Sequence, residues 1–157
     1  MANKIEGHFV NVVGNYAVIV TRWNEFITES LKNGAVDTLE RHGVKSENID
    51  VIYCPGAYEI GLTALKAGET GKYKAIITLG AVIRGSTPHF DVVVQTVNRH
   101  VAELNIKLGI PIVFGILTTD SIEQAIERAG TKAGNKGSEA ALVAIEMSSL
   151  IQKIAEK

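Results

Sequence analysis

Four short apolar runs rich in β-branched residues alternate along this chain with longer segments of helical period. The runs cover residues 16–21, 50–54, 75–80 and 112–117. Strands joined through helices pair in parallel, and a parallel sheet needs helices over both faces. The pattern therefore predicts an α/β fold with a central four-stranded parallel sheet between two helical layers.

The segments between these runs carry helix signals. Apolar residues recur every four positions from Ile27 to Leu39, with Asn24 placed to cap this helix and Gly43 to end it. Further helices are predicted over 58–67 and over 89–108, where the second of these stops at Gly109. A short helix capped by Asp120 or Ser121 is expected to reach Ala129, and small residues line one face of a final helix.

The segment before the first run, residues 7–13, is also apolar and strand-like, but no helix separates it from the run. We expect an N-terminal edge strand there, and an exposed edge invites pairing with the sheet of a neighbouring subunit. No repeat, low-complexity tract or linker divides the chain, so residues 1–157 are expected to form a single domain.

Composition removes several classes of function. The net charge of -1 argues against nucleic acid as a main partner, because binding to phosphate backbones requires a basic excess. No apolar run approaches the roughly 18 residues that span a bilayer. A single cysteine, Cys54, forms no intrachain disulfide, which favours a small core residue in a cytoplasmic protein.

Polar and aromatic residues follow every predicted strand, at residues 22–24, 55–59, 84–89 and 118–120. Ligands of parallel sheets gather at these carboxyl ends, so the four loops predict one site. Trp23 either stacks on a planar ring or packs over the first helix. Glu59 opens a helix, where capping is its simplest role.

A second set of residues suits an anion and proton exchange. The loop Gly85-Ser86-Thr87 precedes a helix and resembles a phosphate cradle, although it matches neither common nucleotide-binding fingerprint and also suits an ordinary turn. At the start of that helix the dipole disfavours a charged His89, and a neutral imidazole can accept and return a proton; a surface histidine is the alternative. Arg128 can grip a phosphate with its planar fork, or it belongs to a solvated basic face. No cluster has metal-ligand spacing.

Four segments together carry a resemblance to a known family. They are Arg22-Trp23-Asn24, Pro55-Gly56-Ala57-Tyr58-Glu59, residues 80–91 (GAVIRGSTPHFD) and residues 124–137 (QAIERAGTKAGNKG). In this order they resemble the signature segments of lumazine synthases. The resemblance implies a three-layer flavodoxin-like fold and a transferase of riboflavin biosynthesis. The implied reaction condenses 5-amino-6-ribitylaminouracil with 3,4-dihydroxy-2-butanone 4-phosphate to 6,7-dimethyl-8-ribityllumazine, water and phosphate, without cofactor or metal.

The same resemblance assigns roles to particular residues. It implies that His89 is the catalytic group that moves protons and that Phe114 reaches over from the adjacent subunit. Ser86, Thr87 and Arg128 are expected to hold the phosphate. The pyrimidine and ribityl chain are expected to contact Trp23, Ala57, Tyr58, Glu59, Ala81, Val82, Ile83 and Phe114. It also implies a homopentamer with active sites between subunits, and in some members an icosahedral shell of sixty subunits.

Some positions depart from the family pattern. Gly61 stands where a proline is usual, Val92 where a tyrosine is usual and His100 where a glycine is usual; Leu65, Ala67 and Lys74 are also atypical. We therefore keep an alternative open, in which the assembly surface is altered, with Leu65 exposed on it. In that case the chain is a structural pentameric building block of a natural or engineered protein cage, which receives a second protein component and retains the site without relying on catalysis.

Overall fold

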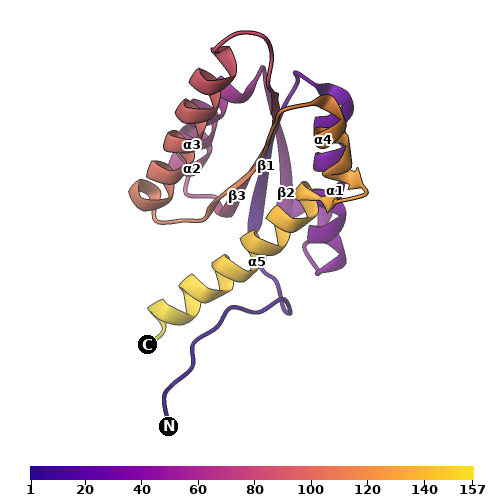
Figure 1. The fold of residues 1–157 in the computed structure, drawn as a ribbon. Coiled ribbons are helices and arrows are strands. Elements are labelled where there is room, and N and C mark those ends of the chain that lie inside the picture. Colours follow the sequence, from indigo (N-terminus) through magenta and orange to yellow (C-terminus); the bar gives the residue numbers. More distant parts are fainter.

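The computed structural model describes residues 1–157 and contains a four-stranded parallel sheet of strand order β2-β1-β3-β4 (Figure 1). The strands are β1 (Asn15–Thr21), β2 (Ile49–Cys54), β3 (Tyr73–Ile83) and β4 (Ile112–Thr119). The helices are α1 (Glu25–Arg41), α2 (Ile60–Glu69), α3 (His89–Leu108), α4 (Ile122–Glu127) and α5 (Lys136–Ala155). Two short 3-10 turns, η1 (Ser46–Asn48) and η2 (Ala57–Glu59), flank β2, and a hairpin of β5 (Ala129–Thr131) and β6 (Gly134–Asn135) precedes α5. The predicted α/β fold with a central parallel sheet is confirmed.

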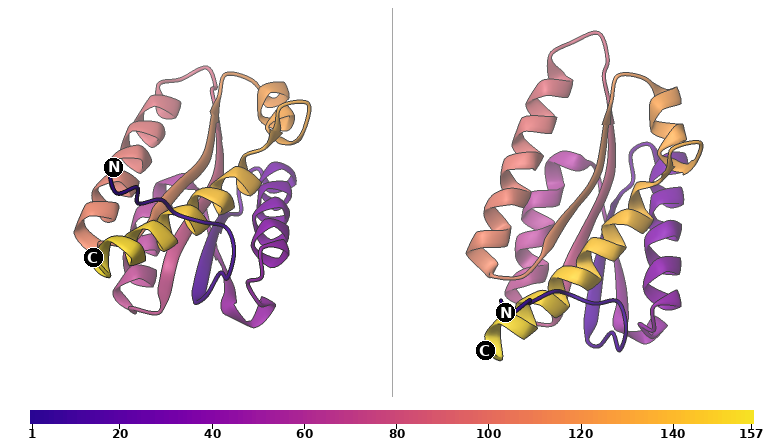
Figure 2. Two further views of the ribbon diagram at one scale, coloured as in Figure 1. Left: turned by 90° about the horizontal axis from the view of Figure 1, so that it is seen from below. Right: turned by 60° about the horizontal axis from the view of Figure 1, so that its bottom comes forward.

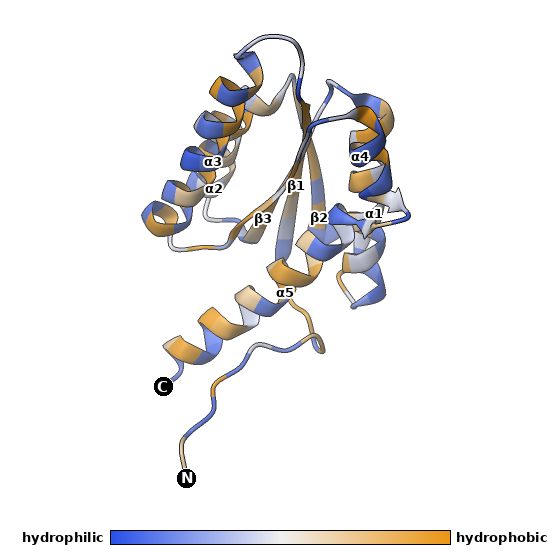
Figure 3. Ribbon diagram, in the orientation of Figure 1, coloured by the Kyte–Doolittle hydropathy of each residue, from blue (hydrophilic) through white to orange (hydrophobic).

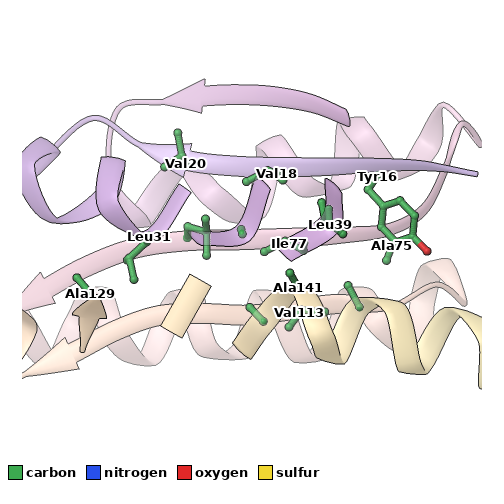
Figure 4. Packing of buried hydrophobic residues seen from close by; sticks show 14 of the residues in the cluster. Tyr16, Val18, Val20, Leu31, Leu39, Ala75, Ile77, Val113, Ala129 and Ala141 are labelled. Atoms are coloured by element: carbon green, nitrogen blue, oxygen red, sulfur yellow. The ribbon is translucent and has the colours of Figure 1, made fainter. Parts of the chain in front are cut away.

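The sheet separates two apolar clusters. One cluster joins it to α1 and α5 and includes Tyr16, Leu31, Ile77 and Ala141, all at most 1% exposed (Figure 4). The other joins the opposite face to α2 and α3. Hydrophobic and hydrophilic residues alternate around the long helices (Figure 3), as expected of helices that cover a sheet with one side and meet water with the other. No helix combines the length and the apolar character that a membrane span requires.

Helix α3 has the predicted bounds, and it ends where Gly109 adopts a left-handed conformation with φ of 67°. The strands β3 and β4 run further than predicted at their carboxyl ends, and α4 ends at Glu127, before Ala129. Ser121 caps α4 by accepting a hydrogen bond from the backbone N–H of Gln124. These extensions carry the strand ends towards the loops that form the site.

Helices α1 and α5 pack closely because Gly137 leaves room for the α1 backbone. A Cβ atom on Gly137 would lie 1.9 Å from the carbonyl oxygen of Leu31. Asn135 fixes this contact from two sides: its Oδ1 accepts hydrogen bonds from the N–H groups of Gly137 and Ser138, and its Nδ2 donates to the carbonyl of Ser30 at 3.0 Å. One side chain thus caps α5 and ties it to α1.

Asn135→Ala is expected to lower the free energy of unfolding by about 1–2 kcal/mol, since it removes the cap of α5 and leaves the carbonyl of Ser30 without its donor. Asn135→Asp keeps the capping oxygen and is expected to lose roughly half as much. Urea unfolding at one fixed protein concentration measures both variants. Asn33→Ala, an exposed asparagine of α1, serves as the control, and equal midpoints for all three variants would contradict the assignment.

The predicted N-terminal edge strand at residues 7–13 does not form within the single chain, and its pairing with a neighbouring subunit stays a prediction. These residues form no strand, and they cross α5 instead (Figure 2). The backbone N–H of His8 donates to Ser149 Oγ at 2.8 Å, and Lys153 Nζ donates to the carbonyl of Glu6 at 2.8 Å. A strand needs a partner edge, and the segment meets a helix here.

The atypical residues of α2 and α3 are partly interior. A Cβ on Gly61 would lie 2.4 Å from Nδ1 of His100, so the small residue on α2 receives the ring from α3. Leu65 is half-buried against the core and Ala67 is buried. The expectation of an exposed Leu65 is therefore wrong, and the departures at 61 and 100 form one size-matched contact between two helices.

Candidate active site

A cleft of about 490 Å³ opens at the carboxyl ends of β1, β2 and β3. These ends lie towards the top of the molecule in Figure 1, where the chain passes from strands into helices. The cleft is lined by Thr21, Trp23, Asn24, Gly56, Ala57, Tyr58, Glu59, Ala81, Val82, Ile83, Gly85, Thr87, His89, Phe90 and Val93. Its wall is thus mostly apolar and aromatic, with a few polar groups, as is usual for small-molecule sites.

The loop after β1 supplies Trp23, whose side chain is 70% exposed. Its backbone N–H donates to the carbonyl of Pro55, and its ring lies beside Gly56, where a Cβ would come within 3.4 Å of the ring. Of the two interpretations of Trp23, the exposed position in the cleft favours stacking on a ligand over packing on α1.

Asn24 immediately precedes α1 but does not cap the helix with its side chain, which corrects the prediction. Its backbone is left-handed, with φ of 62°, and its Nδ2 donates to the carbonyl of Ala81 at 2.8 Å. This bond joins the loop after β1 to the end of β3, so it fixes the width of the cleft between them.

The turn after β2 carries Ala57, Tyr58 and Glu59. Glu59 Oε2 accepts a hydrogen bond from the N–H of Gly56 at 3.1 Å, so its predicted capping role is confirmed, while Tyr58 is 57% exposed at the rim. Cys54 just before the turn is buried, and this burial raises the pKa of its thiol. The cysteine is a core residue, as expected.

The loop after β3 leads into α3. His89 is the first residue of that helix and is exposed at the cleft, together with Thr87 and Gly85. A Cβ on Gly85 would meet nothing within 4 Å, so the chain itself leaves this side of the loop open. Ser86 is exposed but is not among the residues that line the cleft.

Phe114 and Arg128 do not lie in this cleft. They line a second pocket of about 410 Å³ along β4, which is an edge strand of the sheet. Arg128 Nη1 donates to the carbonyl of Gln124 at 2.9 Å and lies 3.7 Å from Glu127 Oε2, which leaves much of the guanidinium exposed. Lys136 and Glu139 of α5 face the same pocket.

One chain thus brings nine of the predicted site residues into the cleft, while Ser86 lies outside its lining and Phe114 and Arg128 lie in the second pocket. The cleft is also lined by residues to which no site role was assigned, although three of them (Asn24, Gly56 and Phe90) lie inside the signature segments; the other two are Thr21 and Val93. Val93 lies one helical turn after His89, so the helical period of α3 was the signal for it. No group of three His, Cys, Asp or Glu side chains is arranged to hold a metal.

A parallel α/β sheet with a cleft at its carboxyl ends defines a flavodoxin-like protein with a small-molecule site. A family model described as 6,7-dimethyl-8-ribityllumazine synthase matches residues 14–152. The chain therefore belongs to the lumazine synthase family, the transferases that form 6,7-dimethyl-8-ribityllumazine in riboflavin biosynthesis. Membership of this family implies small-molecule substrates and an oligomeric assembly.

Proposed function

We propose that the cleft and the pocket along β4 are two halves of one active site, completed between adjacent subunits. In it the enzyme condenses 5-amino-6-ribitylaminouracil with 3,4-dihydroxy-2-butanone 4-phosphate. The observation that carries this proposal is the split itself: Trp23, Thr87 and His89 line one cavity, while Phe114 and Arg128 line another. A neighbouring chain that presents its β4 edge to the cleft would supply the missing pair.

In this arrangement the pyrimidine stacks on Trp23 and meets the main chain of the two neighbouring strand ends. Ala57, Tyr58 and Glu59 lie on one side of the cleft and Ala81, Val82 and Ile83 on the other, which suits a flat ring with a polar ribityl chain. The Phe114 ring of the neighbour closes the apolar wall. The mostly apolar wall of the cleft suits a ring substrate that carries no charge.

The phosphate lies between the loop after β3 and the neighbour's Arg128. Thr87 and Ser86 offer hydroxyl and backbone donors next to the N-terminus of α3, where the helix dipole favours an anion. Arg128 adds a planar cationic fork that can bind two phosphate oxygens. The phosphate is lost as a leaving group, so this subsite also receives the second product.

The chemistry requires orientation and proton exchange. Schiff-base formation joins the amine to the ketone with loss of one water, phosphate leaves, and ring closure expels a second water; each step moves protons between nitrogen, oxygen and carbon. Most of the rate enhancement of such a condensation comes from holding the two reactants close together in the reactive orientation. His89 at the cleft can accept and return protons.

We infer a homopentamer as the working unit, because the family resemblance implies five subunits and a head-to-tail contact between cleft and β4 edge can close into a ring. Residues 7–13 are the segment that we assign to pairing with the edge of a neighbouring sheet, where Val51 and Tyr53 of β2 are 37% and 40% exposed. The particle mass in solution distinguishes a pentamer from a shell of sixty subunits. A cytoplasmic location fits the single buried Cys54.

The only tryptophan of the chain provides a direct test of the cleft. Titration with the pyrimidine substrate is expected to quench Trp23 fluorescence with saturation, and the assay with both substrates is expected to release lumazine and phosphate in equal amounts. Trp23→Phe removes the signal and serves as the control. Unchanged fluorescence at substrate concentrations that saturate turnover would contradict the placement of the pyrimidine.

A further inference from the structure

Arg84 makes three kinds of contact just before the loop at residues 85–87. Its Nε donates to Asp120 Oδ1 at 2.8 Å, and its Nη1 lies 3.5 Å from Asp91 Oδ1. Its Cζ lies 4.3 Å from the centre of the Phe90 ring, so the guanidinium stacks on that ring. Phe90 in turn lines the cleft. The planar group therefore joins the end of β3, the first turn of α3 and the loop after β4.

Asp120 continues this contact towards the second pocket. Its backbone N–H donates to Gln124 Oε1 at 2.8 Å, and the carbonyl of Gln124 accepts from Arg128 Nη1 at 2.9 Å. A continuous set of polar contacts thus runs from Arg84 through Asp120 and Gln124 to Arg128. At one end Arg84 stacks on Phe90 of the cleft, and at the other end Arg128 lines the pocket along β4. The cleft and this pocket belong to different active sites in the proposed assembly.

The partners of Arg84 argue against a direct role in phosphate binding. The guanidinium pairs with two carboxylates, and its hydrogen bond to Asp120 raises the pKa of Arg84. The side chain therefore stays protonated and paired within the protein. It is not among the residues that line either cavity. Single exposed ion pairs contribute little to stability, but a stacked, forked guanidinium that joins three segments fixes their relative orientation.

We propose that Arg84 is a positioning residue for the phosphate subsite: it holds the loop at 85–87 and helix α4 in register, so that Thr87 of one site and Arg128 of the next keep their geometry. This inference rests on the proposed function. Because phosphate binding depends on the placement of both groups, loss of Arg84 weakens binding of the phosphate-bearing substrate and leaves the pyrimidine subsite intact.

Steady-state kinetics of Arg84→Gln test this proposal. The KM for 3,4-dihydroxy-2-butanone 4-phosphate is expected to rise about tenfold, whereas kcat and the KM for the pyrimidine change less than about twofold. Inhibition by inorganic phosphate is expected to weaken in parallel. Arg41→Gln is the matched control, because Arg41 pairs with Asp37 at the far end of α1. A change in folding alone would affect both KM values and kcat together.

Two further variants separate positioning from direct contact. Arg84→Lys keeps the charge without the fork and is expected to behave like Arg84→Gln; recovery of the normal KM by lysine would overturn the proposal. Asp120→Ala removes one of the two carboxylates that pair with Arg84, so a direct electrostatic role predicts tighter phosphate binding, whereas positioning predicts weaker binding. If Arg128→Ala raises the KM for the phosphate substrate but Arg84→Gln and Asp120→Ala do not, the positioning role of Arg84 is wrong while the proposed phosphate subsite stands. If Arg128→Ala also has no effect, the proposed phosphate subsite fails.

Discussion

His89→Ala is expected to lower kcat about 100-fold and to change either KM less than about threefold. His89 is exposed at the cleft on the first turn of α3, next to the loop that we assign to the phosphate. Proton exchange by one positioned side chain is typically worth two or more orders of magnitude. Turnover continues in the variant because the two substrates remain oriented, and orientation supplies the larger share of the rate.

The replacement His89→Asn distinguishes proton exchange from hydrogen bonding. An amide can donate and accept hydrogen bonds, but it does not titrate near neutral pH. We expect this variant to be as slow as His89→Ala in single-turnover experiments with saturating substrates. Full activity of His89→Asn would show that the imidazole only orients a substrate.

Arg128→Ala is expected to raise the KM for the phosphate-bearing substrate about 30-fold, since a charge-assisted hydrogen bond to an anion contributes about 2 kcal/mol. The guanidinium is anchored through Gln124 but is otherwise exposed in the pocket along β4. The KM for the pyrimidine is expected to stay within about twofold, because the two substrates occupy different parts of the composite site.

Arg128→Lys provides the graded control for this residue. It retains a point charge without the bidentate fork, so the KM for the phosphate substrate is expected to lie between those of the parent and the alanine variant. Titration with inorganic phosphate, measured as competitive inhibition, gives an independent value for the same subsite. An equal loss for both substrates in Arg128→Ala would contradict a role confined to the phosphate.

Local sequence patterns predicted the elements that depend on local signals. Helix α3 has its predicted bounds because Gly109 ends it through a left-handed backbone that favours glycine. Asn24 is different: its side chain bonds to Ala81, which is 57 residues away, and no local capping pattern contains that information. The segment at 7–13 forms no strand within the single chain for a related reason, since its strand pattern says nothing about which surface it contacts.

The part of the site that depends only on the strands being parallel could be predicted from the sequence. Loops after parallel strands share one end of a sheet, so the pattern predicts that Trp23, Glu59 and His89 lie together. The order of strands is not local information, and it makes β4 an edge. The family resemblance already implied that Phe114 reaches over from the adjacent subunit, and the three-dimensional structure adds that Arg128 lines the same second pocket.

Subunit complementation tests the composite site most directly. Subunits with Thr87→Ala and His89→Ala lack two functional groups of the cleft, and subunits with Arg128→Ala lack the arginine of the pocket along β4. An oligomer made of either variant alone is expected to turn over slowly at limiting concentrations of the phosphate substrate. When the two are mixed one to one in the unfolded state and refolded together, about a quarter of the sites combine two intact halves. Recovery of roughly a quarter of the parent activity is the predicted result. Activity no higher than the average of the two pure variants would contradict a site shared between subunits.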